Sequence, residues 1–322
     1  MSSTNVLDAG SLFAGEVRAY FAPVDRVNGT PMAFDAASIG RFNLDTPPAG
    51  WIDAGIVSTV KRDTGESWKA VWSGAPAMVK SQGRSKVEEI VEVLLPGWTR
   101  MAVALSAGTQ TMNLLKTAAG VNANPSGGTA VAAEVVGSGS TATMLQLGSA
   151  TAVRAGDVVV VDVDYDGATG YVGSGITGAY VATVPEMPDV DFVRRVSFNI
   201  ARVLSVDGSA VTLASPLPAG VPDPGTRVSV VEGFVDRNGG SFAQEWSALF
   251  VVDGFQGDRL ILHYPRLQPA GGGAAENALE MTKGVTRWRP MARMVALPVI
   301  DAVDGVGVVS FRSYLPAAMR RV

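Results

Sequence analysis

Three aspartates at alternate positions form the best candidate for a metal site in this sequence. Asp162, Asp164 and Asp166 precede Gly167 in the segment DVDYDG. This pattern resembles the opening of a calcium-binding loop, in which carboxylate oxygens surround a hard cation. An EF-hand would place a bidentate glutamate at the twelfth position, but that position here is Gly173, and no helical pattern flanks the segment. The sequence favours solvated carboxylates at a strand end, with calcium binding as the alternative.

A second candidate is the glycine-rich segment GSGITG, Gly173–Gly178, which has the G-x-G-x-x-G spacing of dinucleotide-binding loops. Those loops hold a pyrophosphate at the N-terminus of a helix. The residues that follow, AYVATVPEMPD, favour β structure and include Pro185 and Pro188, so no helix is expected there. We interpret the segment as a flexible loop and predict no cofactor.

The other signatures of catalysis are missing or incomplete in the sequence. The single histidine, His263, alternates with apolar residues in RLILHYPRL, which is typical of a structural histidine on a strand. Glu88 and Glu89 are adjacent, so on a strand they point to opposite faces and cannot act together on one glycosidic bond. There is no cysteine and no G-x-S-x-G, H-E-x-x-H or G-K-[ST] motif. We therefore predict no catalytic residues and no enzymatic activity.

Composition points to a structural rather than a nucleic-acid-reading protein. Of the 322 residues, 47% are hydrophobic and only 17% are charged, which suggests surface that is buried between subunits. The net charge of -4 argues against a basic surface that reads nucleic acid, although DNA could still pass through a channel. We found no apolar run long enough to span a bilayer and no secretory signal, so we expect a soluble protein without a membrane partner.

Strands dominate the first part of the chain. GEVRAYFAPV, GWIDAGIVSTVKR and ESWKAVWSG all read as strands, and in the last of these Trp68, Ala70 and Trp72 share one face. We interpret the tryptophans as core or subunit interface. SKVEEIVEVLL reads as a strand with one wetted face. The spacing from Trp98 to Leu105 then predicts a short helix over residues 98–107 with one buried stripe, which Gly108 ends.

The middle of the chain reads as an inserted β domain. A passage rich in small residues follows Ala118, and strand patterns then recur in RAGDVVVVDVDY, FNIARVLSVDGSAVTLASPLP and GTRVSVVEGF. The Asp207-Gly208 pair favours a tight hairpin turn. We predict a mainly β protein in which residues 129–237 form a small β-barrel-like domain, inserted between residues 1–128 and 238–322 of a larger β-sandwich or barrel.

Three segments resemble the major tail tube proteins of long-tailed, siphovirus-like bacteriophages: WIDAGIVSTVKRDTGESWKAVWSG, SKVEEIVEVLLPGWTRMAVALSAGTQTMNLL and QGDRLILHYPRLQ. The resemblance covers roughly Gly15 to Ala118 and Ser241 to Pro316. It implies a tail-tube β-sandwich with one short α-helix, in which a loop at residues 74–84 and the N-terminal arm before Gly15 reach an adjacent ring.

The same resemblance implies a structural role in the virion tail. Six copies would form a ring, and rings assembled in the host cytoplasm would stack into a tube through which DNA passes without sequence-specific binding. The implied partners are further copies of the chain and the tape measure, tail terminator and distal tail proteins.

Three other readings stay open at this point. A secretion-system or contractile-tail tube would share the ring assembly. A capsid decoration or tail terminator protein would assemble without stacking. A carbohydrate-binding or carbohydrate-cleaving β protein would use the insertion, where Tyr165, Tyr171 and Tyr180 could stack on sugars, although packing is the commoner role of such residues.

Overall fold

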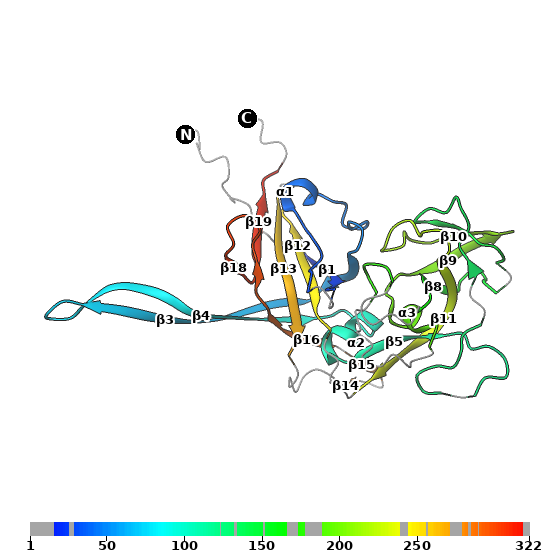
Figure 1. Ribbon diagram of the computed structural model, residues 1–322, viewed down its shortest axis with the longest axis horizontal. Coiled ribbons are helices and arrows are strands. Elements are labelled where there is room, and N and C mark those ends of the chain that lie inside the picture. Colours follow the sequence, from blue (N-terminus) through cyan, green and yellow to red (C-terminus); the bar gives the residue numbers. More distant parts are fainter. Residues whose placement is uncertain are drawn as a thin grey trace.

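In the computed structural model the chain folds into two large antiparallel β-sheets, and a long β-hairpin extends from the first of them (Figure 1). The expected mainly β class is confirmed. The structure describes residues 16–25, 29–122, 124–131, 134–150, 152–165, 173–177, 189–238, 244–255, 257–270, 279–282, 285–288 and 290–317. Within these ranges there are three short helices rather than the single one expected: α1 (Ala36–Ile39), α2 (Arg100–Ala107) and α3 (Phe192–Val196).

The first sheet has eight strands, and its path runs β2-β1-β12-β13-β16-β4-β3, with β19 paired to β13 on the edge opposite β12. Two small hairpins, β14–β15 and β17–β18, accompany it. The bounds of these strands are β1 (Val17–Pro23), β2 (Ile52–Val57), β3 (Thr59–Ser73), β4 (Met78–Leu94), β12 (Trp246–Asp253), β13 (Arg259–Pro269), β14 (Leu279–Thr282), β15 (Val285–Trp288), β16 (Met291–Ala296), β17 (Val299–Ile300), β18 (Gly307–Val308) and β19 (Phe311–Leu315).

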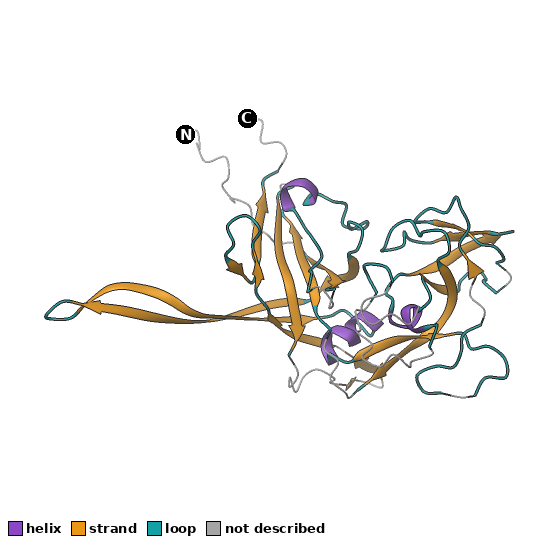
Figure 2. Cartoon of the chain, in the orientation of Figure 1, coloured by secondary structure: helices purple, strands orange, loops and turns teal. Residues whose placement is uncertain are grey.

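Both faces of the first sheet are covered at its centre. Along β1 the side chains alternate, so Phe21 packs into the core that α2 covers, whereas Tyr20 packs into a second core beneath the segment 32–51. Most apolar residues of β1, β12 and β13, which are among the orange strands of Figure 2, are therefore buried whichever face they lie on. This explains why β12 reads as a nearly continuous apolar run, SALFVV.

Helix α2 begins two residues later than predicted because Thr99 is its N-cap. The Thr99 hydroxyl accepts a hydrogen bond from the backbone N–H of Ala102 (3.1 Å), which leaves Trp98 outside the helix and half exposed. Gly108 ends the helix with φ of 63°, as the sequence predicted. Every residue from Arg100 to Ser106 is buried, so the helix is enclosed on all sides and the expected single buried stripe is wrong.

The second sheet has seven strands, β5-β11-β8-β9-β10-β7 with β6 paired to β11. A bridge between Val136 and Leu147 also joins the end of β6 to the end of β7, so the pairings run in a closed, barrel-like circuit around one apolar core. Gly208 lies between β9 and β10 with φ of 59°, as the predicted tight turn requires. The strands are β5 (Gln110–Leu115), β6 (Glu134–Val135), β7 (Met144–Gln146), β8 (Val158–Asp162), β9 (Ile200–Asp207), β10 (Ala210–Leu213) and β11 (Arg227–Arg237).

The second sheet takes strands from both sides of the sequence boundary expected at residue 129. Strand β5 directly follows α2, yet it pairs with β11. The two sheets also share a buried junction, where the ring of Phe198, just before β9, lies edge-on to Trp246 of β12, with 5.3 Å between ring centroids. The barrel-like part is therefore packed against the first sheet rather than held by a linker alone.

Strands β3 and β4 form the hairpin that extends far beyond the rest of the molecule (Figure 1). Residues Gly74–Ala77 make the turn, and strand pairing resumes at Met78. The loop expected at residues 74–84 is therefore much shorter, because residues 78–84 continue β4 and pair with β3. No helix in the described part of the chain is long and apolar enough to cross a membrane. The expected N-terminal arm before Gly15 lies outside the described residues.

Candidate functional site

The distal half of the β3–β4 hairpin is the most conspicuous exposed feature of the chain, and we call residues 67–86 the arm tip. Five large apolar side chains lie exposed on it, with exposed fractions between 44% and 67%: Trp68, Val71, Trp72, Met78 and Val79. A large exposed apolar surface generally marks a place where another molecule binds. The arm tip is therefore a candidate interaction site.

Both faces of the arm tip contribute to this apolar surface. Trp68, Ala70 and Trp72 share one face, as the alternation predicted, and the register places Val79 opposite Trp72. Val71 and Met78 belong to the other face. The two tryptophans are 55% and 63% exposed, so they are not in the core of the chain. The sequence predicted that they lie in the core or at a subunit interface, and their exposure excludes the core.

The arm tip is also basic. Lys69, Lys80, Arg84 and Lys86 lie between residues 67 and 86, and no acidic residue does. Arg84 lies over the ring of Trp68, 5.3 Å from its centroid, and also forms an ion pair with Glu66. Neither Lys69 nor Lys80 forms an ion pair within the described residues. The net charge of -4 hides this local excess of positive charge because it averages over the whole chain.

The base of the hairpin is fixed to the first sheet by a buried polar cluster. Glu89 of β4 is 3% exposed, and its Oε1 accepts hydrogen bonds from Arg62 Nε (2.7 Å) and from the hydroxyl of Tyr264 (2.6 Å). The hydroxyl of Ser310 donates to its other oxygen. Burial raises the pKa of Tyr264 above its usual range. Glu88 lies on the opposite face and pairs with Lys86, so the prediction that the two glutamates diverge is confirmed.

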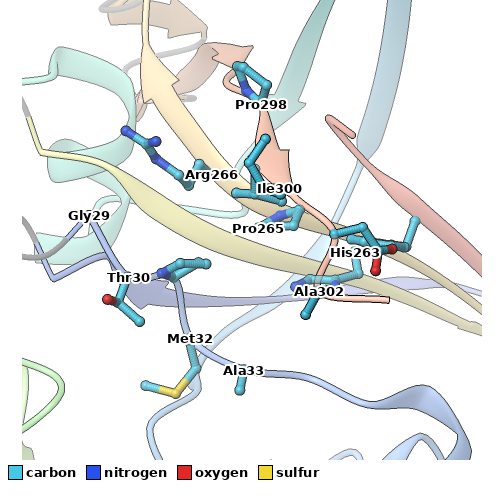
Figure 3. A pocket seen from close by; sticks show the side chains of 14 residues that line it. Gly29, Thr30, Met32, Ala33, His263, Pro265, Arg266, Pro298, Ile300 and Ala302 are labelled. Atoms are coloured by element: carbon cyan, nitrogen blue, oxygen red, sulfur yellow. The ribbon is translucent and has the colours of Figure 1, made fainter. Parts of the chain in front are cut away.

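A cleft of about 460 Å³ lies elsewhere on the first sheet, between the segment 29–33 and the chain around β17 (Figure 3). Met32 and Ala33 line one side, whereas Pro265 and Ile300 line the other. The lining is mostly apolar, with few charged groups. Its volume is within the range of about 300–1,000 Å³ that is usual for clefts that bind ligands.

The turn that joins β17 to β18 borders this cleft, and we call residues 300–306 the acidic turn. Ile300, Val303 and Val306 are 71%, 94% and 54% exposed, and Asp301 and Asp304 alternate with them. The side chains of the two aspartates also shape the turn, because each Oδ1 accepts a hydrogen bond from a backbone N–H two residues later. The turn therefore combines exposed apolar surface with negative charge.

His263 lies at the wall of the cleft and serves in packing. It is 8% exposed on β13, its ring stacks on Phe311, and the edges of Phe34 and Trp51 approach it. Burial lowers the pKa of His263 to about 4, so its imidazole is neutral near pH 7. Among the described residues its ring contacts are with aromatic side chains, which is the structural role that the sequence predicted.

The aspartates proposed as calcium ligands have other partners. Asp162 is 2% exposed, and its Oδ2 accepts hydrogen bonds from three hydroxyl groups at 2.7–2.8 Å, those of Ser174, Thr177 and Ser197. Its Oδ1 accepts two backbone N–H groups. Asp162 is thus a buried carboxylate rather than the solvated one expected, and its donors tie β8 to the segment 173–177 and to the end of α3.

Asp164 forms ion pairs with Arg194 (2.7 Å) and Arg227 (3.5 Å), and Asp166 lies outside the described residues. In the part of the chain that the structure describes, no three histidine, cysteine or acidic residues come together as metal ligands would. Calcium binding by the three aspartates thus stays a prediction from sequence, and the arrangement of Asp162 and Asp164 does not favour it.

The glycine-rich segment is packed rather than loose where it is described. Residues 173–177 form a turn in which Ile176 and Thr177 are buried, and Gly173 has a φ of 117° that favours glycine. Gly178 and the two prolines after it lie outside the described residues. The expectation of a flexible loop is therefore wrong for residues 173–177, since their hydroxyl and amide groups bind Asp162.

A buried arginine at the junction of the two sheets was not expected from the sequence. Arg100, at the start of α2, donates to Asn113 Oδ1 (2.8 Å) and to backbone carbonyls that include that of Val196 (2.8 Å). Its guanidinium lies 3.9 Å from the centroid of the Phe198 ring. Burial lowers its pKa to about 9. Arg100 therefore joins the two sheets through carbonyl groups, and a charged residue at a helix start gives no sequence signal for such a role.

The aromatic residues proposed for sugar stacking give no exposed platform. Tyr165 is buried, and its ring lies edge-on to Phe192 at 5.7 Å; Tyr171 and Tyr180 lie outside the described residues. Comparison with models of protein families found no matching family, and a search of curated proteins found no matching protein. The fold and the candidate site define the class of the molecule: a mainly β chain with a projecting, apolar and basic hairpin.

Proposed function

We propose that this chain is a structural subunit of a bacteriophage tail tube, which assembles with copies of itself into stacked rings of six. The tube would guide DNA from the capsid to the host. The proposal rests on the sequence resemblance for the identity of the assembly. It rests on the arm tip for the claim that the chain binds another molecule.

The arm tip is the main observation behind the proposal, because its exposed apolar side chains are poorly explained in a chain that stays monomeric. A two-stranded ribbon is at best marginally stable alone in water, and this ribbon exposes Trp68 and Trp72 on one face and Met78 on the other. Burial of a large aromatic side chain contributes roughly 1.5–3 kcal/mol, which a free arm forgoes. A hairpin that binds a neighbouring subunit would recover that free energy.

The edges of the first sheet give independent support. Strands β2 and β3 end the path of the sheet, so each has an edge without a strand partner among the described residues. Long open edges promote pairing with other chains, and closed rings remove them. An arm that binds a different surface of the next copy gives a head-to-tail contact, which forms a ring if the rotation closes and a filament if it does not.

The net charge of the chain supports the proposed role in conducting DNA. The chain has a net charge of -4, and the basic residues of the arm tip leave the remainder more acidic still. An acidic lumen repels phosphate and would let DNA slide. Carbohydrate binding by the second sheet has weaker support, because Tyr165 is buried in that sheet's packing.

Negative-stain electron microscopy of the untagged protein, over a range of concentrations, tests the proposal. We expect rings or hollow filaments with a regular axial repeat, and a mass for the smallest ring that corresponds to six chains. A single ring that never stacks would point instead to a decoration or terminator protein. A monomer at every concentration would contradict self-assembly and make a glycan screen the next experiment.

A further inference from the structure

We propose that the arm tip of one copy binds the acidic turn, residues 300–306, and the adjoining cleft of a second copy. This inference rests on the proposed function and deepens it, because it names the surface that receives the arm. Two surfaces that the described part of one chain leaves uncovered match in apolar exposure, in charge and in size.

The apolar surfaces are complementary in kind. The acidic turn exposes three large aliphatic side chains within seven residues, and Val303 at 94% is the most exposed large hydrophobic residue in the described chain. The arm tip offers tryptophan and methionine side chains. Neither set packs against the core clusters of its own chain. Contact between them would bury both sets together, which provides the main driving force for association.

The charges of the two surfaces are opposite. Lys69 and Lys80 have no ion pair within the described residues, whereas Asp301 and Asp304 lie between the apolar residues of the acidic turn. No ion pair with either aspartate occurs among the described side chains. Complementary charge around an apolar centre guides two surfaces into one orientation and disfavours contact between surfaces of equal charge.

The cleft beside the acidic turn has room for an aromatic side chain. It holds about 460 Å³, and Ile300 and Asp301 belong to both the cleft and the turn. A tryptophan at the arm tip could therefore enter the cleft while Lys80 stays near the aspartates. Aromatic residues that fill a pocket at the centre of an interface usually contribute most of the binding free energy.

The contact has to form between two copies. The arm tip lies at one extreme of the molecule's longest axis, well away from β18, to which the acidic turn leads (Figure 1). Seven residues of extended strand, from Ser67 to Ser73, span roughly 23 Å at about 3.3 Å per residue. The arm and the acidic turn are different surfaces, so the contact is head-to-tail and can continue from copy to copy.

Sedimentation velocity of the full chain over a range of concentrations tests this placement with two neutralising variants. Lys69→Gln with Lys80→Gln removes charge from the arm tip. Asp301→Asn with Asp304→Asn removes it from the acidic turn but keeps the oxygen that accepts the hydrogen bond shaping each turn. We expect each double variant to require about tenfold more protein for the same degree of association. Asp223→Asn, on an exposed residue of the second sheet's loops, is the control and should behave as wild type.

A compensating pair of changes extends the test. Lys80→Glu and Val303→Lys should each weaken association, and the two changes in one chain should associate more strongly than either alone. The arm variants could weaken association while the acidic-turn variants behave as wild type and the combined changes give no rescue. That result would overturn this docking surface but would leave self-assembly through the arm standing. If the wild-type chain itself stays monomeric at every concentration, the proposed function fails and this inference with it.

Discussion

The two halves of the β3–β4 hairpin have the same backbone structure but opposite surroundings. At the base, β4 pairs with β16 as well as β3, and Val91 and Val93 are fully buried. At the tip, the same two strands pair only with each other, and every residue from Met78 to Val87 is exposed. The base is held by its own chain, whereas the tip has nothing in the described chain to hold it.

This difference shows that strand patterns alone do not separate folding residues from binding residues. Tryptophan in the tip and valine in the base both favour strands, and both alternate along them. Only the position of the neighbouring strands shows that Val91 fills the core and that Trp72 is free to bind another molecule.

Loss of the buried carboxylate at the base should have the largest effect on stability. Glu89→Ala leaves the Arg62 guanidinium and the Tyr264 hydroxyl without their acceptor, so we expect the free energy of unfolding to fall by about 3 kcal/mol. Urea denaturation measures this loss. The control is Glu92→Ala on the same strand, whose ion pairs with Lys61 and Arg293 are partly exposed, and it should cost less than about 1 kcal/mol. Equal losses would contradict the role assigned to Glu89.

The body of the first sheet should also lose stability in mild acid because of His263. An unfolded histidine binds a proton below a pKa of about 6.5, but the folded pKa is about 4, so the unfolded state takes up more protons between these values. Stability that is complete above pH 6.5 should therefore fall as the pH drops towards 4, by up to about 3 kcal/mol.

Urea denaturation of wild type and His263→Phe at several pH values isolates this contribution, because the phenylalanine keeps an aromatic ring against Phe311. The stability difference between the two proteins should change between pH 6.5 and 4. A difference that stays constant across that range would contradict burial of a neutral imidazole.

Changes at the tip should leave stability almost unaltered but impair association. Trp72→Ser alters an exposed side chain, so we expect its free energy of unfolding to stay within about 0.5 kcal/mol of wild type. Its association should weaken by more than about tenfold, as is usual for a central interface tryptophan. Leu204→Ser, at an equally exposed apolar site on the second sheet, is the matched control for sedimentation velocity. A marked loss of stability in Trp72→Ser would mean that the tip belongs to the fold.

The smallest effect should be the dependence of association on salt. Exposed charges are screened over about 8 Å at physiological ionic strength, so added sodium chloride should weaken association by less than about tenfold. Lys69→Gln with Lys80→Gln should reduce that dependence. Light scattering during salt titration measures both, and an unchanged dependence in the variant would exclude these lysines from the contact.

Sequence alone predicted the parts of the fold that depend on local signals. The alternation in β4, the Asp207-Gly208 turn and the stop at Gly108 all follow from backbone geometry and side-chain period. The two short helices α1 and α3 were missed because four or five residues carry too little periodicity. The membership of β5 in the second sheet was missed because pairing between distant strands leaves no local pattern.

The candidate site could be predicted only in part. Trp68, Ala70 and Trp72 were correctly assigned to one face, but the choice between core and interface needed the position of the remaining strands. Once the limits of the hairpin are known, the sequence shows that the tip has four basic residues and no acidic one. Asp162 was expected to be solvated and Arg100 was not singled out, because sequence does not show which carbonyl and hydroxyl groups converge on them.

The most direct test of the central claim is to shorten the arm and measure the mass of the protein in solution. Ser67 and Lys86 are opposite each other in the ladder, so residues 68–85 can be replaced by Asn-Gly, which favours a two-residue hairpin turn. We predict that the shortened chain unfolds at the same urea concentration as wild type and stays monomeric, whereas wild type forms rings and filaments as its concentration rises. Assembly of the shortened chain at wild-type concentrations would contradict the claim that the arm tip holds the copies together.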